Sequence, residues 1–275
     1  MNEKIVKDAI EGTAVVQRNY DLSKKIPDHH LETLIYAAAN SPSKQSEEHY
    51  SVRVFTEPNK IRQIYTDCTK LFGLAKDEDD FKEMYKEVNG VFQQNEELSI
   101  TNSQVWANVL FVFIERIGET RGGSSWIAEN ESKLKNQGNT HRTPRNRWGN
   151  ARDILWDQVR YSMGISIGQL ILTANMLGYK TGINSGFYYD RLQYYLNQGK
   201  EINEDHYLGN DGKNEAKMMV GIGFPQEGVD SRMHPEVLNK DVREKFRTGP
   251  DQENWLFPTF EKTCHVELNG TEYKI

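Results

Sequence analysis

Histidine and cysteine are the residues that most often bind metals or act as nucleophiles, and their spacing in this sequence favours neither role. The seven histidines form no H-x-x-x-H pair and no cluster with cysteine, and Cys68 and Cys264 stand alone in the chain. A protein metal site needs several such ligands close together. The sequence also lacks the phosphate-binding G-x-x-x-x-G-K-[ST]. A metal enzyme is therefore not expected.

One glycine pair, Gly221-Ile222-Gly223, has the spacing that opens a dinucleotide-binding loop. The third glycine and the following helix of that fingerprint are missing. The pattern therefore favours glycines at the end of a buried strand over a nucleotide site.

Periodic apolar residues predict the elements that must position any site. Residues 151–177 give the strongest helical pattern, with Gly178 as the C-cap. Residues 105–114 are apolar without a polar stripe, which is typical of a central strand covered on both faces. Weaker patterns predict helices over 3–12, 28–40 with Asp28 as N-cap, and 58–75, strands over 50–55 and 218–225, and a hairpin around Asn269-Gly270.

Two polar stretches interrupt or follow these elements. Residues 118–150 contain a basic run from His141 to Arg147 and no clear periodicity. Such a long segment is either a solvated insertion or a lid over a site, and its length alone does not decide between them. Residues 240–275 form a C-terminal extension with aromatic residues between Trp255 and Phe260. We expect one domain spanning residues 1–275.

The overall charge excludes one class of partner. The chain of 275 residues has 34 Lys and Arg against 40 Asp and Glu, a net charge of −6. A generically basic nucleic-acid binder would need a cationic face, so no nucleic acid is expected. No apolar run is long enough to cross a membrane. The absence of a signal-like N-terminus and of a cysteine framework predicts a cytoplasmic protein.

Several short patterns, spread over most of the chain, together resemble one family. They are Arg18-Asn19-Tyr20 with Ile26-Pro27-Asp28, the run from Ala37 to Tyr50, the run from Gln169 to Gly178, Ser185-Gly186-Phe187, and Val220 to Pro225 with the later Arg232. In this order and spacing they resemble the nitroreductase family of flavin mononucleotide (FMN) enzymes. The resemblance implies an α+β fold, with a central, mostly antiparallel sheet flanked by helices, in an intertwined homodimer. The broad apolar stripe of residues 151–177 also predicts burial on most sides, in a core or in a subunit interface.

The resemblance also assigns cofactor contacts. Arg18 matches the basic residue beside the pyrimidine edge of the flavin, and Arg232 matches an arginine that pairs with the flavin phosphate. The remaining matches belong to a loop that reaches the flavin from the partner subunit and to a turn whose backbone lies against the ring. The full set of expected cofactor-binding residues is Arg18, Pro42, Ser43, Lys44, Ser46, Ser185, Gly186 and Arg232.

The implied activity is electron transfer from NAD(P)H, through FMN, to a nitroaromatic, quinone or similar small acceptor. The flavin carries that chemistry, so no catalytic side chain is expected. The polar phosphate-binding residues of the family correspond here to Ala14, Val15 and Val16. An alternative is therefore a degenerate protein with the same fold and little or no flavin binding, acting in binding or regulation.

Overall fold

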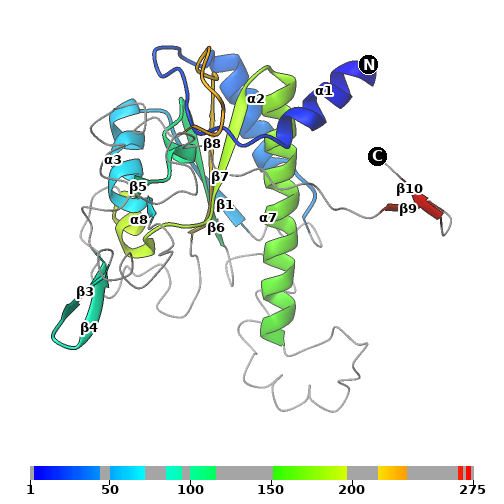
Figure 1. Cartoon of the computed structure of the whole chain (residues 1–275). Helices are drawn as coiled ribbons and strands as arrows, with labels where there is room; N and C mark the ends of the chain where they lie inside the picture. Colours follow the sequence, from blue (N-terminus) through cyan, green and yellow to red (C-terminus); the bar gives the residue numbers. More distant parts are fainter. Residues whose placement is uncertain are drawn as a thin grey trace.

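A four-stranded antiparallel sheet forms the centre of the fold (Figure 1). The computed structural model describes residues 3–43, 50–71, 85–94, 100–115, 151–196, 216–233, 266–268 and 271–273. The sheet order is β1 (Tyr50–Phe55), β6 (Val109–Glu115), β8 (Ala216–Gly223) and β7 (Lys180–Asn184). Every residue of β6 is buried, because the strand is paired on both sides and covered on both faces. The predicted central strand and the α+β class are confirmed.

Helices cover the two faces of this sheet (Figure 1). On one face lie α2 (Asp28–Ala39) and α7 (Ala151–Met176), with α1 (Glu3–Thr13) against α7. On the other face lie α3 (Pro58–Cys68) and α8 (Tyr189–Leu196). Each face of the sheet has its own hydrophobic core. Because side chains alternate along a strand, Phe111 and Phe113 of β6 pack in the core beneath α2 and α7, while Leu110 and Val112 pack in the core beneath α3 and α8.

The remaining elements are short. They are β2 (Lys70–Leu71) paired with β5 (Ile100–Thr101), a 3₁₀ turn η3 (Ser103–Val105), the hairpin of β3 (Tyr85–Val88) and β4 (Val91–Gln94), and the hairpin of β9 (Val266–Leu268) and β10 (Thr271–Tyr273). The predicted C-terminal hairpin is therefore present. The 118–150 segment lies outside the described residues, as does most of the C-terminal extension.

Three predicted boundaries were wrong. The helix predicted over 58–75 ends at Cys68, where the Thr69 hydroxyl donates to the Tyr65 carbonyl and the chain turns into β2. The strand predicted from Val105 begins only at Val109, because Val105 belongs to η3. Asp28 is the first helical residue of α2, and Pro27 occupies the N-cap position.

The C-terminal end of α7 follows the prediction. Gly178 has a φ of +87°, in the left-handed region where glycine carries no steric penalty. Its N–H donates to the Asn175 carbonyl, and the next N–H, of Tyr179, donates to Ala174. These bonds satisfy carbonyls at the helix end and confirm Gly178 as the C-cap.

The glycines of the G-x-G pattern permit close approach of backbone. A Cβ at Gly221 would lie 2.1 Å from the Gln104 carbonyl oxygen, and one at Gly223 would lie 2.0 Å from Asn108 Oδ1. A Cβ at Gly182 of the neighbouring strand β7 would lie 2.8 Å from the same Gln104 oxygen. The glycines therefore let η3 pack directly on β7 and β8, which confirms the buried-strand interpretation.

Gly221→Ala should destabilise the fold by about 1–3 kcal/mol, since backbone must move to admit one methyl group. The control is Arg53→Ala at an exposed position of β1, which should change the free energy of unfolding by less than about 0.5 kcal/mol. Urea denaturation of both variants measures the difference. Equal stabilities would show that η3 does not rest on Gly221 as described.

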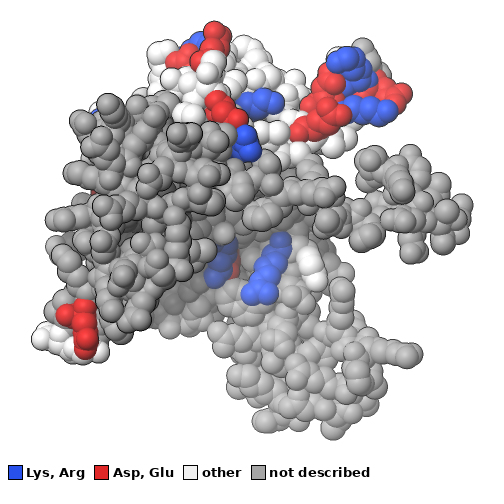
Figure 2. Space-filling view, in the orientation of Figure 1, with Lys and Arg blue, Asp and Glu red and all other residues white. Residues whose placement is uncertain are grey.

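Charges on α1 are mixed in sign. Figure 2 shows acidic and basic side chains next to each other on this helix, where Lys4 pairs with Asp8 at 2.6 Å and Lys7 with Glu3 at 2.8 Å.

No helix among the described residues is long and apolar enough to cross a membrane. Within the same ranges, no group of three His, Cys, Asp or Glu side chains is placed to hold a metal ion.

Candidate functional site

The segment that carries Arg18 is fixed by backbone and side-chain hydrogen bonds. The Gln17 N–H donates to the Thr181 carbonyl of β7 at 2.9 Å, and the Arg18 N–H donates to the Ser231 carbonyl at 2.7 Å. The Asn19 side chain donates to the carbonyls of Asp230 and Met233 at 2.6 and 2.8 Å. The two predicted arginines, 18 and 232, therefore belong to segments that lie side by side.

Two asparagines connect Arg18 to the predicted Ser185-Gly186 turn. Arg18 Nη1 lies 3.4 Å from Asn102 Oδ1, and Asn102 Nδ2 donates to Asn184 Oδ1 at 2.9 Å. The same Asn184 oxygen accepts the Gly186 N–H at 2.9 Å. Arg18, Asn102, Asn184 and Gly186 will be called the Arg18–Gly186 network. It joins two expected cofactor-binding segments that are far apart in the sequence.

The local sequence explains how the side chains of both asparagines are held in place. Asn102 is the N-cap of η3, and its side chain accepts the Gln104 N–H at 3.1 Å. Asn184 ends β7, and its side chain closes an Asx turn onto the N–H two residues later. Both residues are buried. Each of the two asparagines is therefore held at the end of an element, Asn102 at the start of η3 and Asn184 at the end of β7.

Arg18 supplies positive charge to this network from a half-buried position. Burial lowers the pKa of its guanidinium to about 10, with a smaller opposite effect from Tyr20. The side chain remains protonated at neutral pH. A partly desolvated cation attracts an anion more strongly than an exposed one does, because less water screens it. The network can therefore stabilise negative charge on a ligand.

Arg232 is held by a neighbouring carboxylate. Its Nε and Nη2 donate to the two oxygens of Asp230 at 3.1 and 2.9 Å, and its backbone N–H donates to the same carboxylate. These bonds hold the pKa of Asp230 below its ordinary value. The guanidinium must share or leave this carboxylate before it can bind a phosphate.

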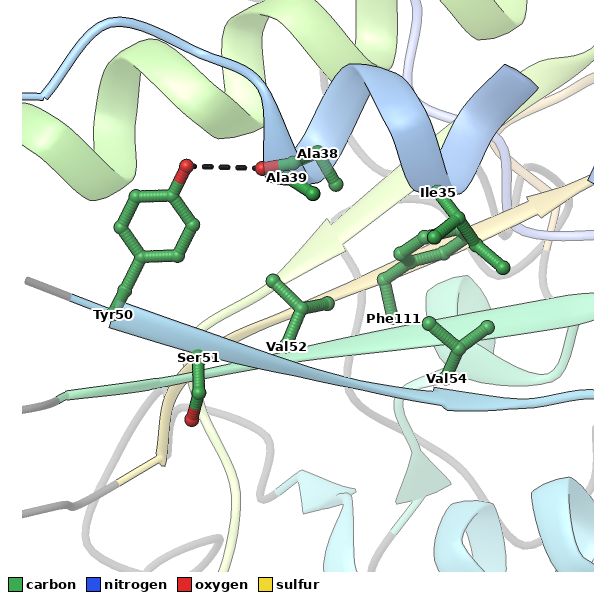
Figure 3. Close-up of a pocket in the computed structure, with 8 residues that line it drawn as sticks. All are labelled: Ile35, Ala38, Ala39, Tyr50, Ser51, Val52, Val54 and Phe111. Atoms are coloured by element: carbon green, nitrogen blue, oxygen red, sulfur yellow. Dashed lines mark hydrogen bonds between the residues drawn. The ribbon is translucent and has the colours of Figure 1, made fainter. Parts of the chain in front are cut away.

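A separate pocket lies between α2 and the edge strand β1 (Figure 3). Its volume is about 260 Å³, and its walls are mainly Ile35 and Ala39 of α2, Val52 and Val54 of β1, and Phe111 of β6. Pockets that enclose drug-sized ligands have volumes of roughly 300–1,000 Å³. This pocket is too small for a flavin, and none of the predicted cofactor-binding residues lines it.

Comparison with known families and structures identifies the chain's relatives. Residues 16–209 match the Nitroreductase family. The chain belongs to this family. Among solved structures, a BluB-like flavoprotein from Clostridium difficile 630 is 16% identical, with a TM-score of 0.50 over 82% of this chain and 92% of that one. The chain has the nitroreductase-like fold that the resemblance implied. No curated protein matches the sequence.

Two further solved structures have lower similarity. A nitroreductase family protein from Clostridium novyi NT is 12% identical, with a TM-score of 0.47 over 88% of this chain and 91% of that one. A nitroreductase-like protein from Streptococcus mutans is 14% identical, with a TM-score of 0.46 over 85% of this chain and 96% of that one.

The positions that the sequence resemblance matches to the family's phosphate site lie on the surface. Ala14, Val15 and Val16 follow α1 and are all exposed; the two valines are 46% and 38% exposed. Exposed valines bring no hydrogen-bond donor to an anion. The segment nevertheless leads directly into the fixed residues Gln17 and Arg18, so it is positioned next to the network.

The loop expected to reach the partner's flavin is described only at its start. Pro42 is exposed and Ser43 is half-buried, just beyond the C-terminal end of α2. Tyr50 connects that end to β1: its hydroxyl donates to the Ala38 carbonyl at 2.9 Å and lies 2.7 Å from Ser41 Oγ (Figure 3). Lys44 and Ser46 lie outside the described residues, so their expected contacts stay predictions.

Asn102 and Asn184 were not selected from the sequence. Asn184-Ser185-Gly186 carries a recognisable Asx-turn signal, and Asn102-Ser103-Gln104 is compatible with an N-cap. Both signals concern local backbone only. The bond between the two side chains spans 82 residues, which no local pattern indicates.

Proposed function

We propose that this chain is an FMN-dependent oxidoreductase that takes electrons from NAD(P)H and passes them to a nitroaromatic, quinone or similar small acceptor. Membership of the nitroreductase family supports the reaction class. The flavoprotein from Clostridium difficile 630 supports a flavin as the cofactor. A bound flavin would supply the electron-transfer chemistry, so the protein's own residues need only bind, orient and stabilise charge.

The Arg18–Gly186 network is the observation that carries this proposal. It places a cation, a glycine turn and buried amide groups together, and these are groups that bind a planar heterocycle with polar edges. Asn184 Nδ2 is buried and has no hydrogen-bond acceptor within the described part of the chain. An unpaired buried donor costs about 1–3 kcal/mol, which an acceptor atom of a ligand would offset. The residues present therefore fit a flavin ring.

The residues fit the phosphate end of FMN less well than they fit its ring. The side chains of Ala14, Val15 and Val16 supply no hydrogen-bond donors, and Arg232 is bound to Asp230. Each missing charge-assisted hydrogen bond costs roughly 1.5–3 kcal/mol of binding. We therefore infer ring recognition close to that of the family and reduced affinity for the phosphate.

The same observations support the rival proposal of a degenerate binding or regulatory protein that has lost FMN. The two proposals differ in one measurable property. Titration of the purified protein with FMN, followed by flavin fluorescence, gives saturable binding if the chain is a flavoenzyme. Anaerobic addition of NADH or NADPH should then bleach the flavin absorbance. A colourless protein without FMN uptake would favour the rival proposal.

We also infer that the chain forms a homodimer through α7. The outward side of this helix carries Tyr161, Ile165 and Met176, which are 55%, 49% and 43% exposed. Gly164 and Gly168 lie between them and meet no neighbouring atom where a Cβ would stand. A contiguous apolar surface of this kind is typical of an interface. A second copy could approach closely over the glycines.

Ile165→Glu should convert the protein from dimer to monomer, because two unpaired carboxylates would be buried at the interface. We expect the dissociation constant of the dimer to rise at least about a hundredfold. Gln63→Glu, at an exposed position of α3, makes a similar charge change on the opposite face and should leave the dimer intact. Sedimentation equilibrium distinguishes the two. A wild-type protein that is monomeric at micromolar concentration would contradict the interface.

Three further features belong to the proposal. The expectation stays that the single domain contains a polar insertion or lid over residues 118–150 and a C-terminal extension over residues 240–275 that contacts the partner subunit. The protein acts in the cytoplasm. Cys68 is a free, buried thiol, and burial raises its pKa to about 12, which disfavours the reactive thiolate at neutral pH.

A further inference from the structure

The orientation of the Asn184 carboxamide is fixed by its partners. Its Oδ1 faces the Gly186 N–H at 2.9 Å, and a backbone N–H can only donate. The atom that faces Gly186 must therefore be the oxygen. Asn184 is 3% exposed, so no rotation toward solvent competes with this arrangement.

The same argument fixes Asn102. Its Oδ1 accepts the Gln104 backbone N–H at 3.1 Å and faces Arg18 Nη1 at 3.4 Å, and both of these groups are donors. Asn102 Nδ2 must then be the atom that donates to Asn184 Oδ1 at 2.9 Å. Two carboxamides in series therefore set the position of the Arg18 guanidinium relative to the Ser185-Gly186 turn.

This arrangement has two consequences for a ligand at the turn. The Gly186 N–H is already used inside the protein, so it is not available to a ligand. Asn184 Nδ2 is buried, and among the described residues it finds no acceptor. The side chain thus replaces the backbone N–H as the donor that this turn offers. Carbonyl oxygens and ring nitrogens, such as those of a flavin pyrimidine ring, are suitable acceptors.

We propose that Asn184 is a positioning residue of the flavin site, which holds Arg18 and the Ser185-Gly186 turn in a fixed relation and donates its free Nδ2 hydrogen to the flavin. This inference rests on the proposed function. Asn184 is assigned no part in electron transfer itself. Its effect is on the geometry of the apo protein and on flavin affinity, which can be measured separately.

Asn184→Asp and Asn184→Ala separate the positioning role of Asn184 from its role as a hydrogen-bond donor to the flavin. Aspartate keeps an oxygen to accept from Asn102 and Gly186 but loses the Nδ2 donor, whereas alanine loses both. Asn108→Ala is the matched control: Asn108 donates to the Asp21 and Lys24 carbonyls and accepts the Phe224 N–H, without a bond to the network. It should lower stability in the same way as the loss of any part-buried asparagine.

The first measurement is hydrogen exchange of the Gly186 amide without FMN. We expect exchange about tenfold faster in Asn184→Ala, and near wild-type rates in Asn184→Asp and Asn108→Ala. The second is FMN titration. We expect affinity about tenfold weaker or more in both Asn184 variants, and unchanged affinity in Asn108→Ala.

The outcomes separate this inference from the proposed function. If the wild-type chain binds no FMN, the proposed function fails and the flavin role of Asn184 fails with it. If the wild-type chain binds FMN and Asn184→Asp binds it equally well, only the Nδ2 contact is overturned. If Gly186 exchange is unchanged in Asn184→Ala, the positioning role is overturned.

Discussion

The double variant Ala14→Arg/Val16→Ser should bind FMN about 30- to 1500-fold more tightly than the wild-type chain. The arginine adds one charge-assisted hydrogen bond to the phosphate, worth about 1.5–3 kcal/mol, and the serine adds one neutral bond of about 0.5–1.5 kcal/mol. Both positions are exposed, so the substitutions should cost little stability. They also adjoin Gln17 and Arg18, whose backbones are fixed to β7 and to Ser231.

Fluorescence titration with FMN measures this gain. Gln63→Arg on α3 adds the same charge at an exposed position away from the network, and it should leave the affinity unchanged. A similar gain in that control would mean that net charge alone attracts the phosphate. An unchanged affinity in the double variant would show that residues 14–16 do not face it.

A second large effect concerns Arg232 and the carboxylate that holds it. Arg232→Ala should weaken FMN binding by about 10- to 100-fold, which corresponds to roughly 1.5–3 kcal/mol for the lost phosphate contact. Asp230→Asn should act in the opposite direction, because it removes the negative charge and one of the two oxygens that hold the guanidinium at 2.9 and 3.1 Å. Equal affinities of wild type, Arg232→Ala and Asp230→Asn would place the phosphate elsewhere.

Arg18→Ala is the comparison variant for that series. We expect it to lower the reduction potential of bound flavin while costing less affinity than Arg232→Ala, because a fixed cation favours the more negatively charged, reduced ring. Redox titration of the bound flavin measures this effect. A potential equal to that of the wild type would remove Arg18 from the vicinity of the ring.

Helices whose apolar residues recur with a clear period, and whose ends are marked by a capping residue, were predictable from the sequence. The 151–177 pattern corresponds to α7, because its apolar residues recur every three or four positions and a glycine caps its end. The β6 boundary was misplaced because a strand buried on both faces has no alternation to mark its start. Val105 and Val109 look alike in the sequence, and only the packing of η3 against Gly221 separates them.

The site was predictable only in part for a related reason. The resemblance selected Arg18 and the Ser185-Gly186 turn, and the structure connects them. The connecting residues, Asn102 and Asn184, meet through tertiary hydrogen bonds that leave no periodic trace in the sequence. The Asp230 carboxylate that holds Arg232 lies only two residues away, but a nearby acid does not by itself indicate a bidentate pair.

Equilibrium dialysis of the purified wild-type chain against FMN tests the central claim most directly. The account predicts saturable binding of one FMN per chain at concentrations well below about 1 mM, with an altered absorbance spectrum of the flavin. Absence of saturable binding up to about 1 mM, where the binding free energy would be weaker than about −4 kcal/mol, would contradict it.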